Sequence, residues 1–168
     1  MKSLILGGAR SGKSRHAEQL AAASGRDVVY LATAEAADAE MTARIAHHRA
    51  QRPAGWALVE EPLALARVLG QQAAAERCLL VDCLTLWLSN LLAVEPSRMQ
   101  QELDALYETL PGLPGDVLLV SNEVGWGIVP DNALARRFRD EAGRLHQRLA
   151  GLCDHVTLVA AGLPLALK

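Results

Sequence analysis

Eight residues near the amino terminus have the composition and spacing of a phosphate-binding loop. The segment Gly7-Gly8-Ala9-Arg10-Ser11-Gly12-Lys13-Ser14 fits the pattern G-x-x-x-x-G-K-[ST]. In such a loop the glycines permit a tight turn, and backbone N–H groups, the lysine amine and the dipole of the following helix all face phosphate oxygens. We therefore predict that the chain binds a nucleoside triphosphate here, with Lys13 as a catalytic group and the Ser14 hydroxyl as a Mg²⁺ ligand.

A carboxylate at the end of another strand would complete the Mg²⁺ site. The apolar run Cys78–Val81 ends at Asp82. Parallel strands bring their carboxyl ends to the same edge of a sheet, where ligands bind. We expect Asp82 to share the metal with Ser14, and the alternative is a solvated aspartate at a strand end.

Two adjacent histidines lie in a segment with helical periodicity, residues 38–52. His48 falls where an apolar stripe meets a basic row formed with Arg44 and Arg52, and His47 points about 100° further round the helix. A neutral imidazole is a competent nucleophile toward phosphorus. The helix alone favours the simpler interpretation that both are surface or boundary residues.

Composition narrows the class of protein. The chain has 168 residues with 17 Lys and Arg against 19 Asp and Glu, and aromatic residues make up 4%. Neither the charge nor the aromatic content suits a nucleic-acid-binding surface. Three scattered cysteines indicate a reduced, cytoplasmic protein, and the longest apolar stretch, Leu84–Val94, falls short of the ~20 residues of a membrane span.

Short apolar runs alternate with longer helical patterns throughout the chain. This alternation, with strands apolar on both faces, predicts one domain over residues 1–168, an α/β fold of the P-loop NTPase (RecA-like) type whose mostly parallel sheet carries helices on both faces. The expected strands are Ser3–Leu6, Asp27–Ala32, Trp56–Val59, Cys78–Val81, Val117–Val120 and Val156–Ala160. The expected helices are Gly12–Ala23, Asp38–Arg52, Pro62–Gln72, Leu84–Leu92, Pro96–Leu110 and Asn132–Ala150.

Further residues combine with these motifs into a family pattern. They are Arg15-His16-Ala17-Glu18, Glu40-Met41, Arg44-Ile45, His48-Arg49, Val81-Asp82-Cys83-Leu84-Thr85, Ser121-Asn122-Glu123-Val124-Gly125-Trp126-Gly127-Ile128-Val129-Pro130, Asn132, Phe138-Arg139-Asp140 and Ala142-Gly143-Arg144. In this order, over nearly the whole chain, the set resembles the bifunctional adenosylcobinamide kinase / adenosylcobinamide-phosphate guanylyltransferase family.

The resemblance implies two reactions of cobalamin biosynthesis. Adenosylcobinamide is first phosphorylated with ATP or GTP, and GMP is then transferred from GTP to that phosphate through a GMP–histidine intermediate, which we place at His48 rather than His47. The family's nucleotide contacts carry over to the phosphate loop and to Ala32, Thr33, Ala34, Arg49, Ala50, Gln51, Arg52, Glu60 and Asp82. The resemblance also implies a homo-oligomer, a trimer.

Several assignments stay open at this stage. Glu60 could accept hydrogen bonds from guanine or be a charge at a helix start. Glu123 could take the proton of the cobinamide hydroxyl or hold its glycine-rich turn, and residues 124–128 could border the corrinoid or pack on their own domain. The apolar segment Leu84–Leu92 could form a subunit contact or, as we favour, core.

Two other functions compete with the bifunctional enzyme. The nearer one is a single-activity P-loop kinase of a small molecule, with a structural His48. The other is a non-catalytic or regulatory nucleotide-binding module, which the absence of a basic DNA-binding stripe from the sequence disfavours.

Overall fold

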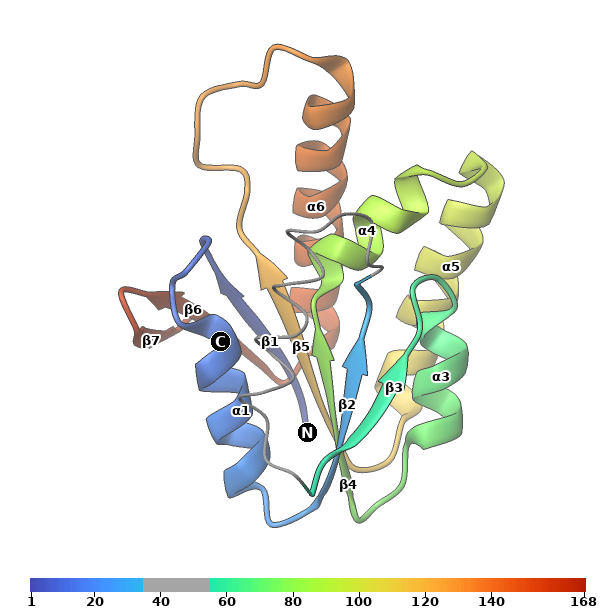
Figure 1. Ribbon diagram of the computed structural model, residues 1–168, viewed down its shortest axis with the longest axis vertical. Helices are drawn as coiled ribbons and strands as arrows, with labels where there is room; N and C mark the ends of the chain where they lie inside the picture. The colour runs from blue at the N-terminus through green and yellow to red at the C-terminus, as the bar shows by residue number, and fades with distance from the viewer. Residues whose placement is uncertain (35–54) are drawn as a thin grey trace.

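The strands form one sheet in the described part of the chain. The computed structural model describes residues 1–34 and 55–168. Seven strands lie in the order β3-β2-β4-β5-β1-β6-β7 (Figure 1). Their bounds are β1 Lys2–Gly7, β2 Asp27–Ala32, β3 Ala57–Glu60, β4 Arg77–Asp82, β5 Asp116–Asn122, β6 His155–Ala160 and β7 Leu163–Ala166.

All pairs but one are parallel, as the sequence predicts. The exception is β7, which runs antiparallel to β6 after a tight turn at Ala161 and Gly162. This strand was not expected, because all four of its residues are exposed and it contains Pro164. Its place at the edge of the sheet explains how a proline fits there, since the outer side of an edge strand needs no ladder hydrogen bond.

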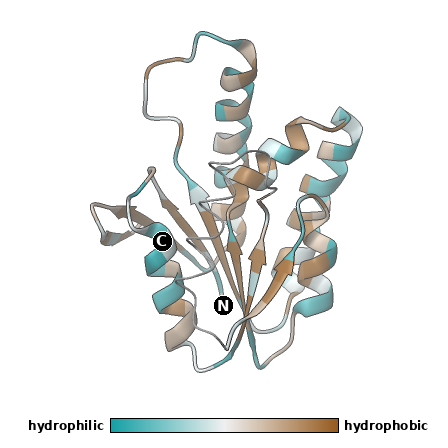
Figure 2. Ribbon diagram, viewed as in Figure 1, coloured by the Kyte–Doolittle hydropathy of each residue, from teal (hydrophilic) through white to brown (hydrophobic). Residues whose placement is uncertain are grey.

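The helices cover both faces of the sheet. Their bounds are α1 Lys13–Ala23, α3 Leu65–Gln72, α4 Leu84–Leu92, α5 Pro96–Thr109 and α6 Ala133–Leu152, with a short 3₁₀ turn at Leu110–Gly112. Alternate strand residues face opposite sides, so Ile5 belongs to the apolar cluster on the side of α1, whereas Leu4 belongs to the cluster that includes residues of α3, α4, α5 and α6. The central strands are apolar on both faces, which Figure 2 shows as brown ribbons.

The helix α4 is part of the core. Leu84, Trp87, Leu88 and Leu91 are fully buried in the cluster between the sheet and α3, α5 and α6. The preference for core packing over a subunit contact is therefore confirmed. In the described residues, no helix is long and apolar enough to cross a membrane.

The helix predicted from Pro62 begins three residues later. The Glu61 carboxylate accepts hydrogen bonds from the N–H groups of Leu63 and Ala64, at 3.0 and 2.9 Å. These two contacts hold the chain in a turn before Leu65, so the proline precedes the helix instead of opening it. The expected helix over residues 38–52 lies outside the described residues.

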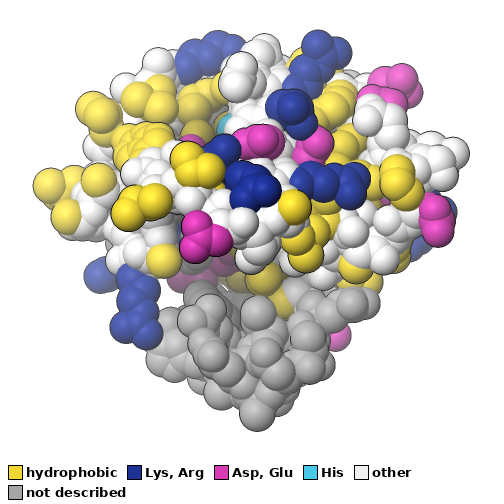
Figure 3. All heavy atoms as spheres, turned by 90° about the horizontal axis from the view of Figure 1, so that it is seen from above, with side chains coloured by type: hydrophobic (Ala, Val, Ile, Leu, Met, Phe, Trp, Pro, Cys, Tyr) yellow, Lys and Arg dark blue, Asp and Glu magenta, His cyan; other side chains and the backbone are white. Residues whose placement is uncertain are grey.

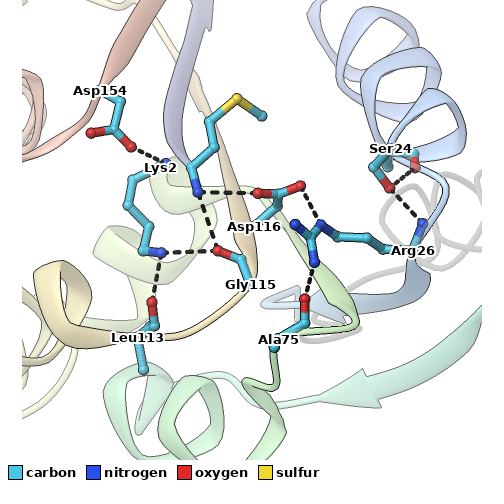
Figure 4. A network of polar contacts seen from close by, with 10 residues as sticks. Lys2, Ser24, Arg26, Ala75, Leu113, Gly115, Asp116 and Asp154 are labelled. Atoms are coloured by element: carbon cyan, nitrogen blue, oxygen red, sulfur yellow. Dashed lines mark hydrogen bonds and ion pairs between the residues drawn. The ribbon is translucent and has the colours of Figure 1, made fainter.

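A polar network closes the amino edge of the sheet, opposite the phosphate loop. The Asp116 carboxylate accepts from the Arg26 Nε at 2.8 Å and from the amino-terminal amine at 3.1 Å (Figure 4). Arg26 also donates to the Ala75 carbonyl, and the Lys2 amine donates to the Leu113 carbonyl. These contacts join the starts of β1, β2 and β5, so the parallel strands are fixed in register at one end.

We predict that Asp116→Ala lowers the free energy of unfolding by about 1–3 kcal/mol, because it removes a buried carboxylate that accepts from both Arg26 and the amino-terminal amine. Urea denaturation measures this change. Glu108→Ala, at an exposed position on α5, serves as the control and should stay within about 0.5 kcal/mol of the parent protein. Equal stability of the two variants would contradict the structural role given to Asp116.

Candidate active site

The phosphate loop spans the turn between β1 and α1. Its backbone takes left-handed conformations at Arg10, with φ 56°, and at Gly12, with φ 96°. Gly8, Ala9 and Arg10 are exposed at the tip of the loop. The loop therefore offers its backbone to solvent at the carboxyl end of β1, the edge where parallel sheets bind ligands.

The rear of the phosphate loop is tightly packed. A Cβ on Gly7 would overlap the Ser11 hydroxyl and the Val159 carbonyl, and a Cβ on Gly12 would lie 3.1 Å from the Gly162 Cα. The Gly162 N–H donates to the Ser11 carbonyl at 2.7 Å. The turn between β6 and β7 thus supports the loop from behind.

Two polar side chains of the loop are withdrawn from solvent. Lys13 is only 8% exposed, and its Nζ donates to the Gly8 carbonyl at 3.3 Å. The Ser11 Oγ is buried and has no hydrogen-bond partner among the described residues. The lysine amine thus lies over the loop itself, where it would meet a bound phosphate.

Three predicted site residues fall in one row across the neighbouring strands. Ala32 pairs with Glu60 on β3 and with Asp82 on β4, and Thr33 and Ala34 follow directly. Glu60 is exposed and Asp82 is half-buried. The structure therefore brings these residues to the carboxyl edge that also carries the phosphate loop.

Asp82 is held by a tyrosine from β2. The Tyr30 hydroxyl donates to Asp82 Oδ2 at 3.0 Å. The donor set of Asp82 and Ser14, a carboxylate and a hydroxyl, consists of the hard oxygen ligands that Mg²⁺ prefers. These residues therefore fit the metal that the family implies.

The Thr33 side chain has a structural partner. Its hydroxyl donates to the Cys83 carbonyl at 2.8 Å and accepts from the Cys83 N–H at 3.1 Å. Next to it, Asn122 Nδ2 donates to the Thr85 hydroxyl at 2.7 Å. Burial raises the pKa of the Cys83 thiol, which therefore stays protonated within this cluster of polar groups. The cluster ties together the ends of β2, β4 and β5.

A second buried cluster joins β5 to α6. Ser121 Oγ lies 2.7 Å from His146 Nε2, and His146 Nδ1 lies 3.7 Å from Glu123 Oε2. Glu123 Oε1 accepts from the Gly125 N–H at 2.7 Å. Of the two roles left open for Glu123, its contacts match the one in which it holds the glycine-rich turn.

The turn after β5 carries large exposed apolar side chains. Trp126 is 76% and Ile128 is 96% exposed. Near it, an apolar cavity of about 460 Å³ lies between the end of α4 and the start of α6, with Leu92 and Phe138 in its wall. Figure 3, which looks from above onto the molecule as it stands in Figure 1, shows hydrophobic side chains beside basic and acidic ones on this face.

The remaining predicted residues lie outside the described residues. They are both histidines, His47 and His48, and the segment Arg49, Ala50, Gln51 and Arg52. Their part in the site therefore stays a prediction.

Sequence reasoning missed Tyr30 and His146 as parts of the site. A signal for Tyr30 existed, since Ala32 faces Asp82 across the strands and a residue two positions earlier shares the face of the sheet. His146 had no comparable signal, because its partners lie 23 and 25 positions away and only the packing of α6 brings them together.

The chain is similar to known proteins over its full length. A family model described as "Cobinamide kinase / cobinamide phosphate guanyltransferase" matches residues 3–167. The bifunctional adenosylcobalamin biosynthesis protein CobP of Pseudomonas aeruginosa is 61% identical over 169 residues, which cover 100% of this chain and 98% of that protein. CobU of Salmonella typhimurium, which has the same descriptive name, is 41% identical over 182 residues, 100% of both chains.

Solved structures of lower identity support the fold alone. A protein of Pyrococcus horikoshii OT3 aligns with a TM-score of 0.59 at 8% identity, over 99% of this chain and 85% of its own. An ATPase of a type III secretion system aligns with a TM-score of 0.57 at 13% identity, over 98% of this chain and 57% of its own. The prediction of a P-loop NTPase-type fold is confirmed. By its sequence, the chain belongs to the cobinamide kinase / cobinamide phosphate guanyltransferase family and is an enzyme of cobalamin biosynthesis.

Proposed function

We propose that this enzyme phosphorylates the hydroxyl of the aminopropanol arm of adenosylcobinamide with ATP or GTP, then transfers GMP from GTP to the new phosphate. The products of the second step are adenosylcobinamide-GDP and pyrophosphate. The observation that carries the proposal is the phosphate loop at the carboxyl edge of the sheet, the same edge that carries the row of Asp82 and Glu60, in a chain of this family.

The kinase step depends on positioning and on neutralising charge. In this proposal the backbone N–H groups of the exposed residues Gly8 and Ala9 and the buried amine of Lys13 bind the β- and γ-phosphates. Mg²⁺, held by Ser14 and Asp82, supplies further positive charge to the phosphate oxygens when bound. In the transfer, the hydroxyl oxygen of the acceptor bonds to the γ-phosphorus, the bond from that phosphorus to the β-phosphate oxygen breaks, and the nucleoside diphosphate and the hydroxyl proton are released.

The guanylyl step uses a histidine as a covalent carrier. A nitrogen of His48 attacks the α-phosphorus of GTP, and pyrophosphate leaves. An oxygen of the cobinamide phosphate then attacks the same phosphorus, and the phosphorus–nitrogen bond breaks. Arg49, Ala50, Gln51 and Arg52 contact the nucleotide in this proposal, which rests on the family pattern.

In this proposal Glu60 recognises the guanine base of GTP. Its carboxylate at the end of β3 would accept hydrogen bonds from the N1–H and N2–H₂ groups of guanine, which adenine cannot offer in the same arrangement. Its exposure and its place in the row with Ala32 and Asp82 support this role. Ala34, half-buried just past β2, lies at the same edge of the sheet and contacts the nucleotide in this proposal.

The corrinoid binds beside the glycine-rich turn in our proposal. Residues 124–128 present exposed apolar groups at Trp126 and Ile128, directly after the strand that neighbours β1. A large macrocycle needs an apolar surface of this kind.

We predict that α-labelled GTP, added without corrinoid, gives an acid-labile adduct on the protein that falls to background in His48→Ala. The reason is that this variant lacks the nucleophile but keeps the phosphate loop. The adduct is measured by denaturing gel and autoradiography.

His47→Ala is the matched control and should keep the adduct. An adduct that survives in His48→Ala and disappears in His47→Ala would move the nucleophile to His47. Phosphorylation of adenosylcobinamide without any adduct in the parent protein would favour the single-activity kinase.

We predict that Tyr30→Phe raises the Mg²⁺ concentration for half-maximal kinase rate by about tenfold, since a hydrogen bond to a charged group contributes roughly 1.5–3 kcal/mol. The hydroxyl fixes one oxygen of Asp82 and so orients the other. Mg²⁺ titration of the kinase rate measures the effect, with Tyr107→Phe on α5 as control. An unchanged Mg²⁺ requirement in Asp82→Asn would remove Asp82 from the metal site.

We further propose a cytoplasmic homotrimer. Cys78, Cys83 and Cys153 are all free and buried, which suits a reducing compartment, and exposed leucines on β7 offer an apolar surface for contact. Sedimentation equilibrium should give a mass three times the 18.0 kDa of the chain. A monomer mass at micromolar concentration would contradict the trimer.

A further inference from the structure

A histidine that neither reaction uses is buried at the edge of the candidate site. His146, on α6, is only 6% exposed, and Ser121, at the end of β5, is fully buried. The hydroxyl and the ring nitrogen Nε2 are 2.7 Å apart. A contact this short between buried groups fixes the orientation of the ring.

The Glu123 carboxylate, 3.7 Å from Nδ1, favours the tautomer of His146 that carries the ring proton on that nitrogen. Burial lowers the pKa of His146, although the nearby Glu123 carboxylate opposes this shift, so the ring is neutral near pH 7. When the Ser121 O–H donates to Nε2, the ring proton lies on Nδ1, the atom 3.7 Å from Glu123 Oε2. The N–H dipole then faces the carboxylate with its positive end.

Glu123 also contacts two other parts of the site. Its other carboxylate oxygen accepts from the Gly125 N–H at 2.7 Å. Its own N–H donates to the carbonyl of Gly7 at 3.0 Å, at the first residue of the phosphate loop. One residue therefore connects α6 and the glycine-rich turn through its side chain and the end of β1 through its backbone.

Ser121 cannot act as a nucleophile despite its resemblance to a hydrolase arrangement. It is fully buried, so no substrate reaches its oxygen. The three groups are more consistent with positioning than with bond making.

We propose that Ser121, His146 and Glu123 form a positioning relay that fixes residues 123–128 beside the phosphate loop, and thereby sets the affinity for the corrinoid acceptor. This rests on the proposed function, in which that turn borders the corrinoid. The relay acts on the acceptor and leaves attack on GTP unaffected, because its contacts to the phosphate loop pass through the backbone of Glu123.

The test uses Glu123→Ala and His146→Phe, with His155→Ala, an exposed histidine on β6, as control. We expect amide hydrogen exchange over residues 123–128 to rise at least about tenfold in both variants. The KM for adenosylcobinamide in the kinase reaction should rise by a similar factor, with kcat within about twofold. The rate of adduct formation from α-labelled GTP should stay at the parent value, and the double variant should match the single ones.

Each contrary result has a distinct meaning. Unchanged exchange over residues 123–128 overturns the relay. Increased exchange with an unchanged KM overturns the link to the acceptor, and with it the corrinoid surface of the proposed function. A parallel loss of adduct formation would show that the cluster supports the phosphate loop instead. Since His146→Phe alters the core, Ser121→Ala is tested beside it, and Glu123→Gln should recover part of the affinity through its remaining amide oxygen.

Discussion

The hydrogen bond from the Gly162 N–H to the Ser11 carbonyl is the contact on which the site most depends. A phosphate loop works only when its amides converge, and a loop with two left-handed residues, Arg10 and Gly12, does not keep that shape unaided. The turn after β6 supplies the missing constraint from behind, while β1, which lies between β5 and β6, fixes the other end. The exposed hairpin of β6 and β7 is therefore part of the nucleotide site, although nothing in its sequence pattern indicates such a role.

The strand β5 makes buried polar contacts on both faces of the sheet, next to the phosphate loop. Ser121 and Asn122 face opposite sides of the sheet, since they are consecutive in a strand. Ser121 contacts His146 on α6, whereas Asn122 contacts Thr85 at the start of α4. Both clusters lie at the carboxyl edge, where β5 still pairs with β1 but its pairing with β4 has ended at Val120. Buried polar contacts hold the end of β5 here, and this explains why residues that touch no substrate are placed next to the site.

The sequence was a good guide to the strands and a poor one to the contacts between them. Long apolar runs such as β4 are predictable because burial on both faces leaves no other composition, and the phosphate loop is predictable because its spacing is chemically required. The strand β7 was not predicted because Leu163–Ala166 buries none of its side chains, so the sequence there shows no alternation of buried and exposed residue types. The late start of α3 depends on the side chain of Glu61, and the pairing of Ser121 with His146 depends on how α6 packs. Both are set by tertiary structure, which local propensity does not contain.

The strand order places a geometric demand on guanylyl transfer. Neighbouring strands are about 4.8 Å apart, so Glu60 on β3 lies four spacings, roughly 19 Å, from the phosphate loop on β1. A GTP whose terminal phosphates occupy the loop and whose base meets Glu60 must lie along the carboxyl edge, over β5, β4 and β2. Its α-phosphate then stands near the middle of that path. With GTP in the proposed position, the nucleophile would approach above the ends of β5 and β4, beside Asp82, and a histidine that attacks from behind the phosphate loop would be on the wrong side of the leaving pyrophosphate.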